Sequence, residues 1–227
     1  SMTNFQEISA ADQVDLSSVN TILSPKSLML PQSESMFQFT LMKTSEQAGI
    51  LREIEKDLSP RVIFAIRPCD AKSFQLLDLN FDTPSYRDPW WTGQRQSTTL
   101  VGLGCNQPCS SCFCTSVGSG PFSTDGLDLL LIDAGDEFAI QTLTEKGKEL
   151  LIKTSVESVG SEASANAVLT RQESSLQAIK SAVSIENLKR HEVKALFDGD
   201  FWDELHFACI NCGVCTYSCP TCWCFDI

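Results

Sequence analysis

Four cysteines near the end of the sequence have the spacing of iron–sulfur cluster ligands. They follow the pattern Cys209-x2-Cys212-x2-Cys215-x3-Cys219, and Pro220 comes directly after the last of them. In ferredoxins, three thiolates at such intervals bind one [4Fe–4S] cluster, and the cysteine that precedes proline ligates a second cluster. Zinc sites more typically use two well-separated cysteine pairs. The pattern therefore favours a ferredoxin-type cluster over zinc.

A second group of cysteines lies in the middle of the chain. The pair Cys112-x-Cys114 can present two thiolates to one cluster, and with Cys69 and Cys105 it makes a set of four, to which Cys109 adds a fifth candidate. Two alternatives to a cluster stay open at this point. The residues are either buried free thiols, since cysteine is among the most buried residue types, or neighbouring thiols with redox chemistry of their own.

Cys222 and Cys224 repeat the Cys-aromatic-Cys form of Cys112 and Cys114. Spacing does not decide whether they are further ligands or packing residues. The sequence holds no second copy of the terminal motif, although a two-cluster ferredoxin module needs one. One possibility is that Cys209, Cys212, Cys215 and a nearby fourth thiol hold one cluster. The other is that the sequence is cut short, and this is the possibility that we expect.

The composition fits metal ligation in a folded protein. All eleven cysteines fall in the two groups, a clustering typical of metal sites rather than of a disulfide framework. With 42% hydrophobic residues the chain can build a core without cysteine staples. The net charge of -12 argues against nucleic acid or an anionic membrane as a partner. The sequence shows no signal peptide and no bilayer-spanning apolar run, so we expect a reducing cytoplasm and no membrane insertion.

The hydrophobic pattern predicts an α/β protein with a mixed sheet. Buried strands are expected over Arg61–Ile66, Thr98–Leu103 and Leu127–Asp133, with a fourth strand over Glu137–Gln141. A half-buried strand is expected over Met36–Leu41, a helix over Ile50–Leu58, and a helix over Ala71–Asp78 capped by Asp70. Helical spacing dominates from Glu145 onward, and Ser155–Ala165 is the expected flexible connection.

These elements must position the cysteines. Cys69 and Cys105 each follow a predicted strand, and functional residues gather at strand ends in such sheets. We therefore expect these two cysteines to meet at one sheet edge. The organisation predicted is an α/β domain over residues 1–154, a helical connection over 155–206, and a partial ferredoxin-type module over 207–227.

Other residues give weaker signals. His191 and His206 have no neighbouring carboxylate or nucleophile at a catalytic spacing, so we expect surface or structural roles. The glycine-rich stretch from Gly118 to Gly126 lacks the fingerprint of a dinucleotide site or P-loop. Arg67 and Lys72 flank Cys69, where their charges would offset those of bound thiolates.

Several motifs in order resemble a known family. They are Ile66-Arg-Pro-Cys69-Asp70, Tyr86-Arg-Asp, Gly104-Cys105 with Cys112-Phe-Cys114, Gly126-Leu-Asp128-Leu, and the run from Cys209 to Cys224. Over roughly Pro60 to Cys224 the chain resembles the iron–sulfur beta subunit of cytoplasmic nickel–iron sulfhydrogenases and the related iron–sulfur subunit of anaerobic sulfite reductase. Family members continue with a second ferredoxin motif, so the resemblance implies a missing C-terminal part.

The resemblance implies a non-catalytic electron-transfer subunit of anaerobic metabolism. Such subunits carry electrons between a flavoprotein that oxidises NAD(P)H and a catalytic hydrogenase or reductase subunit. It implies one or two [4Fe–4S] clusters here, with Cys209, Cys212, Cys215 and Cys219 as ferredoxin-type ligands and Cys69, Cys105, Cys112 and Cys114 as a second set. The alternatives are a zinc-stabilised structural or interaction module and, less favoured, a thiol–disulfide oxidoreductase.

Overall fold

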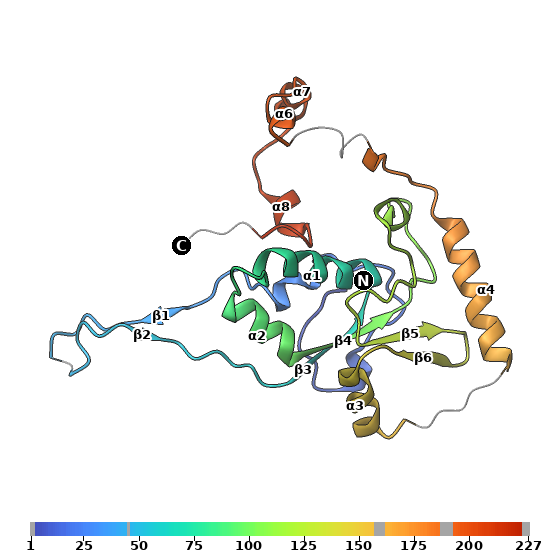
Figure 1. Cartoon of the computed structure of the whole chain (residues 1–227), viewed down its shortest axis with the longest axis horizontal. Coiled ribbons are helices and arrows are strands. Elements are labelled where there is room, and N and C mark those ends of the chain that lie inside the picture. Colours follow the sequence, from blue (N-terminus) through green and yellow to red (C-terminus); the bar gives the residue numbers. More distant parts are fainter. Residues whose placement is uncertain (1–2, 45, 157–161, 187–192, 224–227) are drawn as a thin grey trace.

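The centre of the protein is a four-stranded mixed sheet flanked by helices. The computed structural model describes residues 3–44, 46–156, 162–186 and 193–223 (Figure 1). The strands β3 (Arg61–Ile66), β4 (Thr98–Leu103), β5 (Leu129–Asp133) and β6 (Phe138–Thr142) lie side by side in that order. The first three are parallel, and β6 runs antiparallel to β5. The expected α/β fold with a mixed sheet is confirmed.

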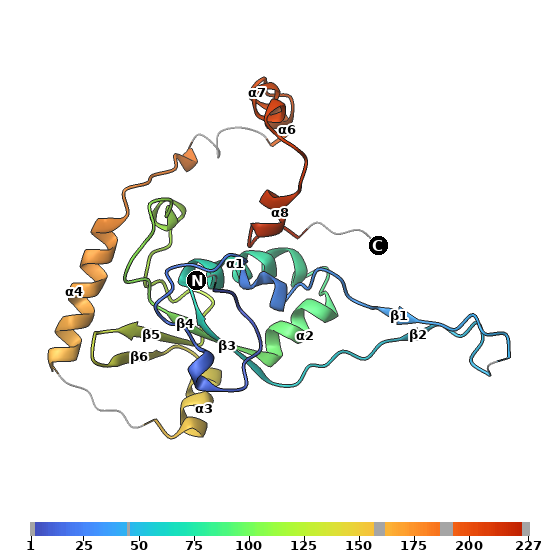
Figure 2. The ribbon, with the colours of Figure 1, turned by 180° about the vertical axis from the view of Figure 1, so that it is seen from behind.

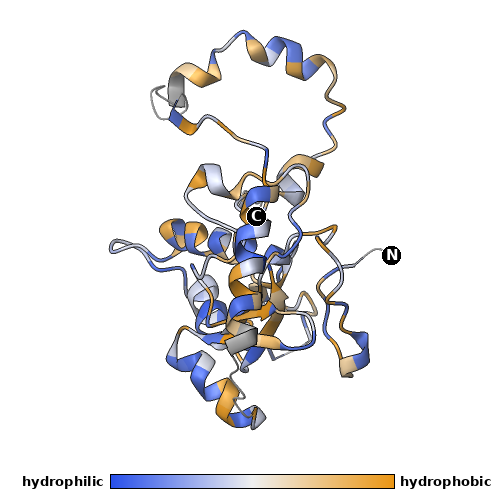
Figure 3. Cartoon of the chain, turned by 90° about the vertical axis from the view of Figure 1, so that its right-hand side faces the viewer, coloured by the Kyte–Doolittle hydropathy of each residue, from blue (hydrophilic) through white to orange (hydrophobic). Residues whose placement is uncertain are grey.

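Helices cover both faces of the sheet. The crossover from β3 to β4 contains α1 (Pro68–Phe81) and α2 (Pro89–Ser97), and the chain after β6 forms α3 (Glu145–Thr154). Alternate strand residues point to opposite faces. Leu100, Leu130 and Ile132 thus pack with α1 and α2, while Leu129 and Leu131 pack with α3. Figure 3 shows these hydrophobic strands at the centre of the molecule.

The edge strand β3 is less buried than its apolar sequence predicts. Ile63 and Ile66 are buried, but Val62 and Phe64, which alternate with Ile63 and point to the other face, are exposed. The register with β4 shifts between Phe64 and Ile66, where Ala65 has a φ of 62°. A bulge of this kind bends the strand, and here it lies just before Cys69.

Two predictions for the N-terminal part are wrong. Residues 36–41 contain only β1 (Phe37–Gln38), and both of its residues are exposed. Within 50–58 there is no helix but β2 (Arg52–Glu53), which pairs antiparallel with β1. Leu51 is 62% exposed. A short helix needs a buried apolar face for stability, and this segment packs on no core; Figures 1 and 2 show it as an extended arm.

The helix after β3 begins earlier than predicted. Pro68 occupies its first position, where proline fits because the missing N–H would have no partner in the helix. Asp70 therefore lies inside the first turn and is not the cap that the sequence predicted. Cys69 is the second residue of α1, at the N-terminal end of the helix that follows β3.

In the described ranges after α3, helices are the only regular elements, as predicted. Its elements are α4 (Glu162–Ala178), α6 (Val193–Phe197), α7 (Phe201–Phe207) and α8 (Val214–Ser218). The expected connection over 155–165 is helical from Glu162, and residues 157–161 lie outside the described ranges. No helix in the described ranges is long and apolar enough to cross a membrane.

A buried carboxylate joins three elements at the start of α3. Asp128 accepts hydrogen bonds from the backbone N–H of Leu100 at 2.8 Å and from the hydroxyl of Thr144 at 2.5 Å. Thr144 in turn caps α3 by accepting from the backbone N–H of Gly147. A Cβ atom at Gly147 would lie 2.2 Å from the carbonyl oxygen of Asp128. The sheet and α3 therefore pack as closely as a glycine allows.

We predict that Gly147→Ala destabilises the fold. The added methyl group forces α3 away from Asp128, which costs about 1–3 kcal/mol of unfolding free energy and outweighs the helix propensity gained. Urea unfolding, monitored by circular dichroism, measures this change in unfolding free energy. The matched control is Gly120→Ala, where a Cβ meets nothing within 4 Å. Equal midpoints for the two variants would contradict the close packing described here.

Candidate metal centre

Parallel strands bring Cys69 and Cys105 to the same edge of the sheet, as the sequence predicted. Cys69 follows β3, and Cys105 follows β4, at the C-terminal ends of both strands. Burial raises the pKa of Cys69 to about 12, with smaller contributions from Asp70, Cys105 and Cys114. The segments that carry Cys69 and Cys105 therefore lie at one edge of the sheet.

Although the Cys69 side chain is open to solvent on one side, its pKa indicates a poorly hydrated sulfur. The thiol form of Cys69 is favoured in the absence of a bound cation.

Arg67 supplies positive charge at this edge. Its guanidinium donates to the carbonyl oxygen of Gly104 at 3.1 Å and also to that of Ser18. Burial raises the pKa of Cys105, and the charge of Arg67 opposes that rise. Arg67 is thus close enough to offset the charge of a Cys105 thiolate. Lys72, by contrast, pairs with Asp125 at 2.7 Å.

Cys109 and Cys112 are in direct contact within the central loop. Their sulfur atoms lie 3.2 Å apart, and the backbone N–H of Cys109 donates to the sulfur of Cys112 at 3.2 Å. Burial raises the pKa of Cys112 to about 11, with a smaller contribution from Cys105. A hydrogen bond with Ser111 is the main reason that the pKa of Cys109 is lowered. Cys109 and Cys112 therefore form a close pair within the loop that follows β4.

Residues from α4 and beyond hold this loop, which sequence reasoning missed. The buried hydroxyl of Ser175 donates to the carbonyl oxygen of Cys105 at 2.5 Å, and Ser181 donates to that of Ser110 at 2.6 Å. The hydroxyl of Ser116 accepts from the backbone N–H of Val183 at 3.0 Å. Figures 1 and 2 show α4 beside the loop between β4 and β5. No local pattern in the sequence predicts these long-range contacts.

The terminal cysteines lie on an exposed turn before and within α8. Cys209, Cys212 and Cys215 are exposed. Asn211 and Gly213 have φ angles of 55° and 71°, a conformation that favours glycine and tolerates asparagine. The turn directs the backbone N–H of Asn211 at the sulfur of Cys209, 3.4 Å away.

Cys219 follows the last residue of α8, and it is less exposed than Cys209, Cys212 and Cys215. Partial burial raises its pKa, but hydrogen bonds with Thr221 and Cys222 outweigh burial and lower the pKa to about 7. A lowered pKa favours the thiolate, which is the form that binds metal. Cys224 lies outside the described residues.

The thiols of the central group are donors that suit an iron–sulfur cluster or a zinc ion. Four thiolates bound to one zinc at about 2.3 Å lie about 3.8 Å from each other. In the ranges that the structure describes, no three cysteine, histidine or acidic side chains are gathered around a single ion position. A cubane binds its thiolates at separate corners. Neighbouring thiols, a nearby guanidinium and backbone amides aimed at sulfur suit such a larger anionic group.

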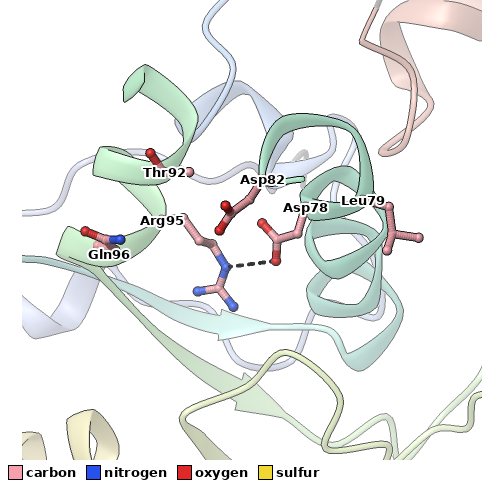
Figure 4. Close-up of a pocket in the computed structure, with 6 residues that line it drawn as sticks. All are labelled: Asp78, Leu79, Asp82, Thr92, Arg95 and Gln96. Carbon is pink, nitrogen blue, oxygen red and sulfur yellow. Dashed lines mark ion pairs between the residues drawn. The ribbon is translucent and has the colours of Figure 1, made fainter. Parts of the chain in front are cut away.

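The charged cavity between α1 and α2 is separate from the cysteines. It encloses about 190 Å³, and its lining includes Asp78, Asp82 and Arg95 (Figure 4). Arg95 lies 4.0 Å from Asp78 and donates to the carbonyl oxygen of Gly126 at 3.0 Å. These contacts join α1 and α2 to the loop before β5, a structural role. His206 is exposed on α7, as expected, and His191 lies outside the described residues.

One curated protein is similar to this chain over nearly its whole length. It is Sulfhydrogenase 2 subunit beta of Pyrococcus furiosus, 27% identical over 226 residues, or 98% of this chain. The family resemblance drawn from the motifs is thereby confirmed. The chain spans 64% of the length of that relative. No protein-family model and no solved structure gives a significant match.

We predict different effects of two neighbouring cysteine substitutions. After anaerobic reconstitution, Cys105→Ser should bind about four fewer irons per chain than the wild type, because it removes a corner ligand of a cubane. Cys109→Ser should retain the wild-type iron content, because the resemblance assigns Cys109 no ligand role. Iron analysis with circular dichroism as a folding check measures both. An equal loss in Cys109→Ser would show that Cys109 is itself a ligand.

Proposed function

We propose that this chain is an iron–sulfur electron-transfer subunit of an oxidoreductase complex. The observation that carries the proposal is the parallel pairing of β3 and β4, which places the segments of Cys69 and Cys105 at one sheet edge, with Cys112 and Cys114 in the loop that follows β4. The similarity to a hydrogenase beta subunit supports it. The terminal motif from Cys209 to Cys219 supplies the ferredoxin-type spacing for a second set.

The proposed organisation follows the two cysteine groups. Residues 1–154 form the α/β domain with the central set, residues 155–206 form the helical connection, and residues 207–227 form part of a ferredoxin-type module. The ligands of the second set are Cys209, Cys212, Cys215 and Cys219. We propose as partners a flavoprotein subunit that oxidises NAD(P)H and a catalytic hydrogenase or reductase subunit.

The chain's own groups suit the holding of a redox centre. A bound [4Fe–4S] cluster exchanges single electrons, and its potential depends on net charge, burial and hydrogen bonds to sulfur. Arg67 supplies a fixed positive charge beside Cys105. The backbone N–H groups of Cys109 and Asn211 point at the sulfurs of Cys112 and Cys209. Such donors favour added negative charge and so favour the reduced state.

Metal analysis of three variants tests the proposal. Anaerobically reconstituted wild-type protein should hold about eight irons and as many sulfides per chain, with a brown colour that dithionite bleaches. Cys69→Ser should lose the central cluster and Cys212→Ser the terminal cluster, each leaving about four irons, because the two sets are separate. The double variant should hold none.

The alternatives predict other results. A zinc-stabilised structural module would bind zinc, remain colourless and show no reduction, which would overturn the proposal. Equal and complete loss of iron in either single variant would show that the two cysteine groups form one site rather than two.

A further inference from the structure

Lys26 binds the loop that carries the last terminal cysteines. Its ammonium group donates to the carbonyl oxygens of Cys219 at 2.7 Å, Cys222 at 3.0 Å and Thr216 at 3.4 Å. An ammonium group has three donors, and all three point at this one loop. Thr216 lies in α8, whose last carbonyls have no partner within the helix. One side chain from the start of the sequence therefore satisfies three acceptors near its end.

The backbone of Lys26 is fixed in the core of the α/β domain. It lies in a short 3-10 helix (Pro25–Leu28) whose first turn is capped by the hydroxyl of Ser24, 3.2 Å from the N–H of Lys26. Pro25 and Met29 on either side are buried. The position of the ammonium group is thus set by the domain rather than by the cysteine loop.

An aromatic contact holds the same loop from the other side. The ring of Trp223 meets that of Phe81, at the end of α1, edge to face with centroids 5.7 Å apart. Phe81 also stacks on the buried Trp91 at 5.4 Å. Figures 1 and 2 both show α8 next to α1. The segment from Thr216 to Trp223 is therefore docked on the domain by one charged and one aromatic contact.

We propose that Lys26 is a positioning residue for the terminal cysteine set, a role that rests on the proposed function. It fixes the Cys219–Cys222 segment against the domain that carries the central set. It also places a positive charge against the backbone of Cys219 and Cys222 in a chain whose net charge is -12. A cation at this place favours added electrons on a bound cluster and raises its reduction potential.

Two substitutions separate the two effects. Lys26→Met keeps the length of the side chain but removes its charge and donors. Lys26→Arg keeps the charge but replaces the three-way donor geometry with a planar fork. The matched control is Lys153→Met, the same charge change at an exposed position in the last turn of α3.

Limited proteolysis of the metal-free chain tests the docking. Chymotryptic cleavage after the exposed Tyr217 should be about fivefold faster or more in Lys26→Met, because loss of the ammonium removes three hydrogen bonds that hold the loop, and the loop then opens more often. Lys153→Met should match the wild type. Unchanged cleavage in Lys26→Met would overturn the positioning role, whether or not the chain binds clusters.

Redox titration of the reconstituted protein tests the charge. In Lys26→Met the equilibrium constant for reduction of the terminal cluster should fall by about threefold to tenfold, where tenfold equals about 59 mV for one electron. The central cluster, and both clusters of Lys26→Arg, should stay near the wild-type values. An unchanged terminal potential in Lys26→Met would overturn the electrostatic role. Absence of iron in the wild type would refute the proposed function and leave the cleavage result to decide the docking.

Discussion

The parallel pairing of β3 with β4 is the constraint on which the candidate metal centre depends. Because both strands run in the same direction, their C-terminal ends lie at one edge, and the residues that follow them, Cys69 and Cys105, meet there. Parallel strands need a crossover, which α1 and α2 provide while they cover one face of the sheet. The same connection therefore builds the core and positions the thiols.

The sequence predicted the parts of the fold whose signal is local. β4 and β5 are buried on both faces, so their apolar runs identify them. Adjacent strand ends then predict that Cys69 and Cys105 lie at one sheet edge, and the parallel pairing of β3 with β4 confirms it. The spacing of the terminal cysteines indicates cluster chemistry without any knowledge of the fold.

Features that depend on distant partners were not predictable. Residues 50–58 have helical spacing, but most of their side chains are exposed and bury no continuous apolar face, so the segment is extended. The sequence pattern favours Asp70 as the helix cap, but the helix begins at Pro68, so Asp70 lies in its first turn. The hydrogen bonds of Ser175 and Lys26 to the two cysteine segments join parts of the chain far apart in sequence. Serine and lysine are common surface residues, and only the fold shows which backbone groups they contact.

The most direct test of the account is the position of iron in crystals of the anaerobically reconstituted chain, located by anomalous diffraction at the iron absorption edge. We predict one compact iron peak at the C-terminal ends of β3 and β4, bonded to sulfur atoms of both Cys69 and Cys105. Iron bound near the terminal motif alone, with Cys69 and Cys105 unliganded, would contradict the claim that the parallel sheet edge builds a cluster site.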